Sequence, residues 1–208
     1  MRDRFRELWI KCNAKSDADC IYANLVKRYS ESHRFYHNLK HIENCLTQID
    51  MLSGNEIDHI ALEFALWFHD IVYNPKANDN EENSALVAKS VCEEAELPES
   101  FSRNVQRLIL LTKHICKPID YMQKVIIDVD LSILGSDAQT YNIFEMNIRK
   151  EYSHVNHRAF LAGRSNLLNG FINRDRIFYT DFFYSKYESS ARSNLTQTIQ
   201  KLKGDQSM

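Results

Sequence analysis

Two histidines stand four positions apart in the stretch YHNLKHI, residues 36 to 42, at a spacing that suits a metal site. Side chains at positions i and i+4 of a helix project from the same side, so His37 and His41 would lie one turn apart. Such short patterns also arise by chance. The pair indicates a metal site only if further ligands come from elsewhere in the chain.

A histidine and an aspartate end the most apolar stretch of the chain, IALEFALWFHDIVY, residues 60 to 73. Apolar residues on nearly every face predict a central helix that is surrounded by others. His69 and Asp70 would therefore be buried. Because an unpaired buried carboxylate costs several kcal/mol, Asp70 needs an arginine, a helix N-terminus or a metal ion as its partner.

Two more carboxylates follow a second apolar run, in KVIIDVDLSILG. Asp128 or Asp130 could cap the short helix expected there, or supply a further metal ligand. His41, His69, Asp70 and Asp130 would together offer two imidazoles and two carboxylates from three helices. Such ligands suit one divalent ion (Mn, Mg, Co, Ni, Zn or Fe) and leave positions open for water and substrate, as in a catalytic site.

The elements that would carry these residues are helices. The chain has only 5 glycines and 3 prolines, and most segments repeat apolar residues at three and four positions. This pattern predicts an all-α bundle. We expect helices at residues 4–29, 36–52, 56–73, 80–95, 98–114, a short one near 130, and then 138–152, 157–171 and 181–202.

Length and composition narrow the class of protein. The 208 residues suit one domain (1–208), with a metal-site core at about 30–135 and helices 136–203 packed on it. A net charge of -2 with mixed signs argues against duplex nucleic acid as a partner. Scattered cysteines, no signal peptide and no membrane-spanning run predict a cytoplasmic protein that binds no membrane.

The order H, then HD, then D resembles the HD superfamily of metal-dependent phosphohydrolases. YHNLKH is similar to the YHNxxH motif of cyclic nucleotide phosphodiesterases, WFHDIVY to their HD segment and DVDLS to their ADLS. These motifs span residues 36–134, about half of the chain. In addition to these motifs, NEENSA, LSILG, the IRKEY run and ESSARSNL resemble a bacterial branch of predicted HD phosphohydrolases.

The resemblance implies an HD-domain-like helical bundle in which four residues ligate the metal: His41, His69, Asp70 and Asp130. Asp128 competes for the last place, and Asp130 is preferred because Leu-Ser follows it directly. His37 matches the phosphodiesterase histidine that protonates the leaving oxygen. Those phosphodiesterases have further histidines after HD for a second metal, and HDIVYNPKAN has none, so one ion is expected.

Weaker candidates follow the HD segment. Lys113 or His114 could reach a substrate phosphate, although a histidine at a helix end also interacts favourably with the helix dipole. Glu81 and Glu82 could hydrogen-bond a ligating histidine, although acidic residues at a helix N-terminus already have an electrostatic reason to be there.

The C-terminal third offers two arginines and an aromatic run. Arg164 and Arg192 could bind phosphate, but they pair equally well with a carboxylate such as Glu188. The run IFYTDFFYSKY either packs over the bundle or forms a subunit contact, which leaves a homodimer open.

These patterns predict a metal-dependent phosphohydrolase acting on a small phosphate ester or a nucleotide. A bound ion would lower the pKa of a coordinated water, Asp70 or Asp130 could orient that water, and His37 could protonate the departing alkoxide. Two alternatives stay open: an HD-type iron oxygenase, and a regulatory protein that binds a metal or a nucleotide without catalysis.

Overall fold

The computed structural model describes residues 1–52 and 58–206, and every regular element within them is helical. Ten α-helices and one 3-10 helix account for these elements, which confirms the prediction of an all-α protein. The predicted start of the third helix at residue 56 lies outside the described residues.

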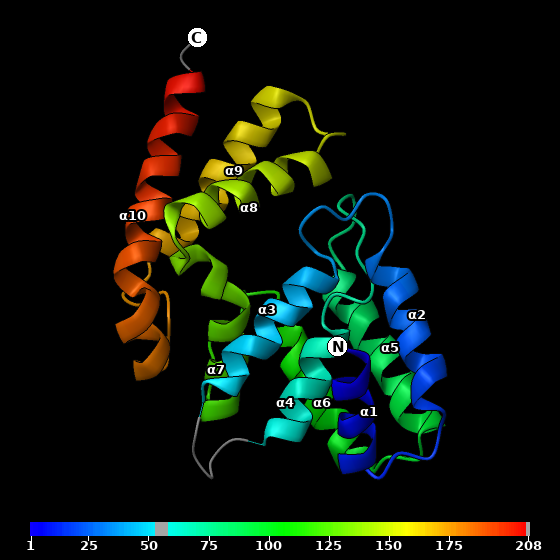
Figure 1. Cartoon of the computed structure of the whole chain (residues 1–208). Helices are drawn as coiled ribbons and strands as arrows, with labels where there is room; N and C mark the ends of the chain where they lie inside the picture. The colour runs from blue at the N-terminus through cyan, green and yellow to red at the C-terminus, as the bar shows by residue number, and fades with distance from the viewer. Residues whose placement is uncertain (53–57, 207–208) are drawn as a thin grey trace. The chain divides into compact units, whose positions relative to one another are not determined.

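The chain divides into two compact units, Met1–Ile127 and Asp128–Met208. The first unit contains α1 (Arg2–Lys11), α2 (Ala18–Tyr29), α3 (Leu39–Asp50), α4 (His59–Phe68), α5 (Asn80–Glu94) and α6 (Glu99–Leu111) (Figure 1). Helix α7 (Tyr121–Leu131) begins in the first unit and ends in the second. The second unit continues with η1 (Ser132–Gly135), α8 (Ala138–Glu151), α9 (His157–Ile172) and α10 (Asp181–Gln206).

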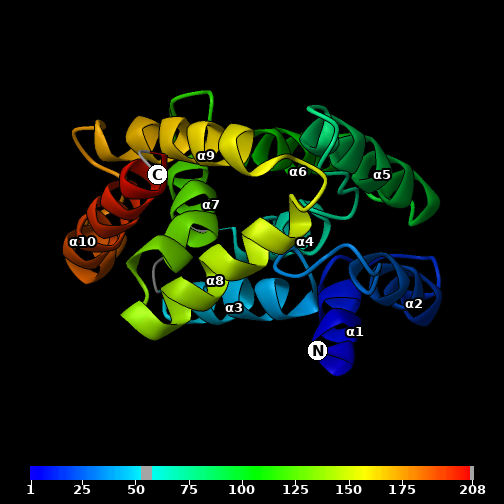
Figure 2. The same cartoon turned by 90° about the horizontal axis from the view of Figure 1, so that it is seen from above.

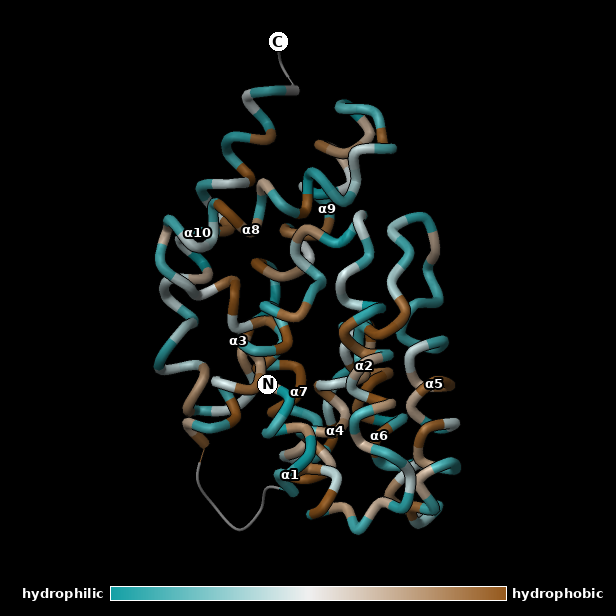
Figure 3. Tube along the Cα trace, turned by 45° about the vertical axis from the view of Figure 1, so that its right-hand side comes forward, coloured by the Kyte–Doolittle hydropathy of each residue, from teal (hydrophilic) through white to brown (hydrophobic). Residues whose placement is uncertain are grey.

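Helix α4 is the centre of the first unit, as the sequence predicts. It contacts α1, α3, α5 and α6. From Ala61 to Phe68 every residue except Glu63 is buried, and the ring of Phe5 meets that of Trp67 edge-on at 5.2 Å. Helices α5 and α6 lie side by side (Figure 2), and hydrophobic and hydrophilic residues alternate along them (Figure 3). Burial of their apolar faces is what holds α4 in place.

The prediction of one helix over residues 4–29 is wrong, because this segment forms two helices, α1 and α2. Asn13 has a left-handed backbone (φ 56) after α1, and the side chain of Asp17 accepts a hydrogen bond from the Asp19 N–H (2.8 Å) to cap α2. The indole of Trp9 donates to the Ser16 carbonyl (2.9 Å) and closes the connection. Asparagine tolerates this backbone and aspartate favours the cap position, so local turn chemistry overrides the helical pattern.

Three further boundaries differ from the prediction, and each moves a candidate site residue. Helix α3 begins at Leu39, because the side chain of Asn38 caps it by accepting from the Lys40 N–H (2.9 Å). Helix α4 ends at Phe68, so the HD pair lies just beyond it. Helix α7 is longer than predicted, because Asp120 accepts from the Gln123 N–H (2.9 Å) at its start. The remaining helices begin within one residue of their predicted starts.

The second unit contains one very close approach of two backbones. The side chain of Asn194 on α10 donates to the carbonyls of Leu134 and Ser136, each at 2.9 Å, and so holds η1 against α10. A Cβ atom added to Gly135 would lie 2.8 Å from the carbonyl oxygen of Tyr187 and 2.9 Å from its Cα. Since real Cβ atoms do not approach that closely, only glycine fits here without a shift of α10.

We expect Gly135→Ala to lower the free energy of unfolding by about 1–3 kcal/mol, the usual cost of overpacking a well-packed site. Gly163→Ala on α9 is the matched control, because nothing lies within 4 Å of its added Cβ. That substitution should stabilise by about 0.5–1 kcal/mol. Urea denaturation of both variants checks the difference; equal effects would contradict the close approach.

Candidate metal centre

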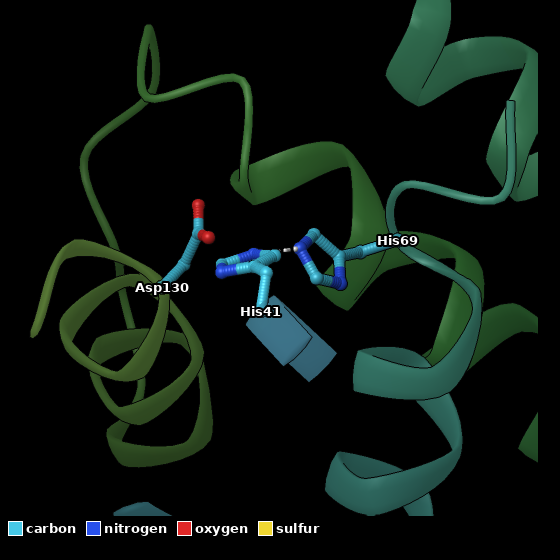
Figure 4. A group of neighbouring side chains, drawn as sticks. All are labelled: His41, His69 and Asp130. Atoms are coloured by element: carbon cyan, nitrogen blue, oxygen red, sulfur yellow. Dashed lines mark hydrogen bonds between the residues drawn. The ribbon is translucent and has the colours of Figure 1, made fainter. Parts of the chain in front are cut away.

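Two buried histidines face each other at the centre of the first unit. His41 lies in the first turn of α3 and His69 directly follows α4, and they are 3% and 1% exposed. Their Nε2 atoms are 3.1 Å apart (Figure 4). The Nδ1 atom of His69 is 2.9 Å from the Leu66 carbonyl, which can only accept. Nδ1 of His69 therefore donates to that carbonyl, which leaves Nε2 as the nitrogen of this ring that could bind a metal.

The carboxylate of Asp70 completes a tight group with these two rings. Its Oδ2 atom lies 3.1 Å from Nε2 of His69 and 3.6 Å from Nε2 of His41. Ligand atoms about 2.1 Å from an ion are roughly 3.0 Å apart in octahedral geometry and roughly 3.4 Å apart in tetrahedral geometry. The three donor atoms therefore have the mutual distances that a divalent ion requires.

The negative charge of Asp70 also suits a metal ligand. Burial by itself would raise the pKa of Asp70, but His69, and more weakly His37 and His41, hold that pKa below its ordinary value. Asp70 is therefore an anion near neutral pH. Glu81 behaves in the opposite way, because burial and the charge of Asp70 raise its pKa.

His37 lies beside this group, although not on the helix that the sequence predicts. It occupies the turn before α3, where its ring stacks on Tyr73 with centroids 4.2 Å apart and lies 6.0 Å from the ring of His41. The prediction that His37 and His41 share a helix is wrong. The turn nevertheless brings His37 close to the ligands.

The two aspartates of the DVD segment have different surroundings. Asp130 lies in the last turn of α7, a helix that starts in the first unit at Tyr121. The side chain of Asp130 is half-buried, whereas that of Asp128 is buried. Neither Asp128 nor Asp130 caps a following helix at its start, because both belong to α7 itself.

Asp128 is fully buried, and both of its oxygens accept hydrogen bonds within the second unit. Its carboxylate accepts from the backbone N–H groups of Tyr179 and Thr180, each at 2.7 Å, and from the Thr180 hydroxyl at 2.8 Å. Burial raises the pKa of Asp128 to about 6, against the opposing effect of these bonds. Its contacts are those of a residue that holds the chain before α10, so we favour Asp130 as the ligand.

No family model matches the chain. No curated protein and no solved structure matches it either. Within the described residues, no helix is long and apolar enough to cross a membrane.

The weaker candidates of the first unit have partners of their own. Lys113 donates to the Asn78 carbonyl (2.7 Å) and forms an ion pair with Glu82, which lowers the pKa of that carboxyl. His114 has a left-handed backbone (φ 59), and its N–H donates to the Leu111 carbonyl (3.0 Å) after α6. These contacts join α5 to the end of α6, and they give Lys113 and Glu82 a structural role.

Both arginine candidates of the second unit form salt bridges. Arg164 pairs with Glu145, and its guanidinium lies 5.2 Å from the ring centre of Phe144. Arg192 pairs with Glu188 and donates to the carbonyls of the turn after α9. These contacts match the salt-bridge alternative that the sequence left open.

Two residues beside the histidines were not candidates from the sequence. The Sγ atom of Cys45 lies 3.7 Å from Nε2 of His41, and the ring of Tyr73 stacks on His37. Cys45 follows His41 by four positions, which is a helical spacing that the pattern could have shown. The contact between Tyr73 and His37 has no comparable signal, because the two residues are 36 positions apart and neither lies in a helix.

Proposed function

We propose that the chain is a metal-dependent phosphohydrolase of the HD type, with one divalent ion held by His41, His69, Asp70 and Asp130. One observation carries the proposal: three buried or largely buried donor atoms of His41, His69 and Asp70 lie 3.1–3.6 Å apart. The resemblance of the motifs to HD phosphohydrolases supports phosphate hydrolysis as the reaction. The substrate would be a small phosphate ester or a nucleotide.

Each side chain has a stated role in this proposal. A bound divalent ion would supply a water of lowered pKa and neutralise charge on a phosphoryl oxygen. The Leu66 carbonyl keeps the proton of His69 on Nδ1, so that Nε2 is available as a ligand. Asp70 supplies negative charge and could orient the attacking water. His37, next to the ligands, would give a proton to the leaving oxygen.

Removal of the metal tests the proposal on the wild-type chain. We expect elemental mass spectrometry to find about one divalent ion per chain after loading with Mn, Co, Ni, Zn, Mg or Fe. Phosphate release from a panel of nucleotides and p-nitrophenyl phosphate should stop after chelation and return when the ion is restored, because the water loses its activation.

Two outcomes would contradict the proposal. If the wild-type chain binds none of these ions, the proposed metal site does not exist. A chain that binds an ion but hydrolyses no phosphate ester would instead favour the regulatory protein, and oxygen consumption with Fe would favour the oxygenase.

A further inference from the structure

A buried arginine joins the two loops that carry the candidate site. Arg34 lies in the loop between α2 and α3, and its side chain is 0% exposed. One terminal nitrogen donates to the carbonyls of Asp70 (2.6 Å) and His37 (3.1 Å). The other terminal nitrogen donates to the carbonyl of Ile71 (3.0 Å).

The rest of the guanidinium is also occupied. Its Nε donates to the carboxylate of Glu31 (3.0 Å), and its central carbon lies 5.1 Å and 5.5 Å from the ring centres of Tyr29 and Tyr73. The charge therefore has an anion, three carbonyls and two aromatic rings around it. A planar group with several fixed donors suits this setting, and the single ammonium of lysine does not.

The carbonyls that accept from Arg34 at Asp70 and Ile71 lie beyond the end of α4. Helix α4 ends at Phe68, and carbonyls at and beyond a helix end lack the partners that a continuing helix would give them. Arg34 supplies those partners at Asp70 and Ile71. It thereby sets the backbone from which the carboxylate of Asp70 reaches to 3.1 Å from His69.

We propose that Arg34 is a positioning residue that fixes Asp70, as metal ligand, and His37, as proton donor, relative to each other. This inference rests on the proposed function. The same guanidinium nitrogen binds the carbonyls of both residues, although Asp70 is 36 positions from Arg34 in the chain. A shift of this nitrogen would displace the ligand and the proton donor together.

Arg192 gives a matched comparison in the second unit. Its guanidinium pairs with Glu188 and donates to the carbonyls of Ile172 (2.9 Å), Arg174 (2.8 Å) and Asp175 (3.1 Å). The contacts are of the same kind, although the Arg192 side chain is 36% exposed, and none of the residues that Arg192 holds is a candidate ligand. Arg192→Lys therefore measures what the loss of such an arginine does to stability alone.

The test is a Co²⁺ titration of the metal-free chain, followed by visible absorption and by thermal denaturation. Arg34→Lys should weaken the affinity for Co²⁺ by about 10-fold, as loss of groups that orient ligands usually does, and alter the absorption bands. Arg192→Lys should lower the Tm and leave both the affinity and the bands as in the wild type. Wild-type affinity and bands in Arg34→Lys would overturn the inference.

A milder variant covers the case in which Arg34→Lys does not fold. Glu31→Gln keeps the arginine and weakens the contact that orients its Nε, so it should also reduce the affinity for Co²⁺. An unchanged affinity in Glu31→Gln would then overturn the inference. If the wild-type chain binds no Co²⁺, the result contradicts the metal site of the proposed function and not only the role of Arg34.

Discussion

On the proposed function, Asp70→Asn is expected to abolish metal binding and to reduce metal-dependent phosphate release by on the order of 10³-fold or more. The amide has the shape of the carboxylate but not its charge, and the oxygen of Asp70 lies within 3.6 Å of both histidine Nε2 atoms. Elemental mass spectrometry and phosphate release, measured on the same samples, check both losses.

Asp128→Asn is the matched control, because it makes the same change at a buried carboxylate of the other unit. It should lower the free energy of unfolding by about 1–3 kcal/mol, since an amide cannot accept from every donor around Asp128. Its metal content should equal that of the wild type. Equal metal loss in both variants would instead attribute the loss to instability, and a metal-loaded Asp70→Asn would exclude Asp70 as a ligand.

His37→Gln is expected to keep the ion and to lower kcat by about 10²–10⁴-fold for esters with an alkoxide leaving group. Such a group departs with a proton, and His37 would give it. An aryl ester such as p-nitrophenyl phosphate needs no proton to leave, so its kcat should fall far less. Comparing kcat for both ester types in the two proteins measures the difference.

His33→Gln is the control for that experiment. His33 belongs to the same loop and donates from Nε2 to the Tyr73 carbonyl (2.8 Å), so its loss disturbs the loop without removing the proposed proton donor. It should lower kcat for both ester types by the same factor. If His37→Gln also affects both types equally, His37 does not protonate the leaving group.

Periodicity predicted most of the helices because their ends have local causes. Asp137 and Asn156 cap α8 and α9 by accepting from nearby backbone N–H groups, and both helices begin where the sequence predicts. One error concerns residues 69–73, where the apolar side chains of residues 71–73 continue the helical pattern after the helix has ended. The carbonyls of Asp70 and Ile71 are held by Arg34 instead, and a hydrogen bond across 36 residues leaves no trace in local periodicity.

The sequence likewise predicted some residues of the candidate site and not others. Residue type and order were enough to predict His41, His69 and Asp70 as a group, and the structure places their donor atoms together. The choice between Asp128 and Asp130 stayed open, because it depends on backbone donors at Tyr179 and Thr180, about fifty positions further along the chain. Arg34 was missed because its role consists of contacts to carbonyls, which every residue has.

The histidines that face each other are 28 positions apart in the chain, so an unfolded chain has no preformed site for the ion. On the proposed function, binding is then linked to folding: an ion at 100 times its Kd would add about 2.7 kcal/mol to the stability of the first unit. The Tm would report the affinity for each ion without any substrate. In a cell, the supply of that ion would set how much of the protein survives proteolysis, as well as how fast it works.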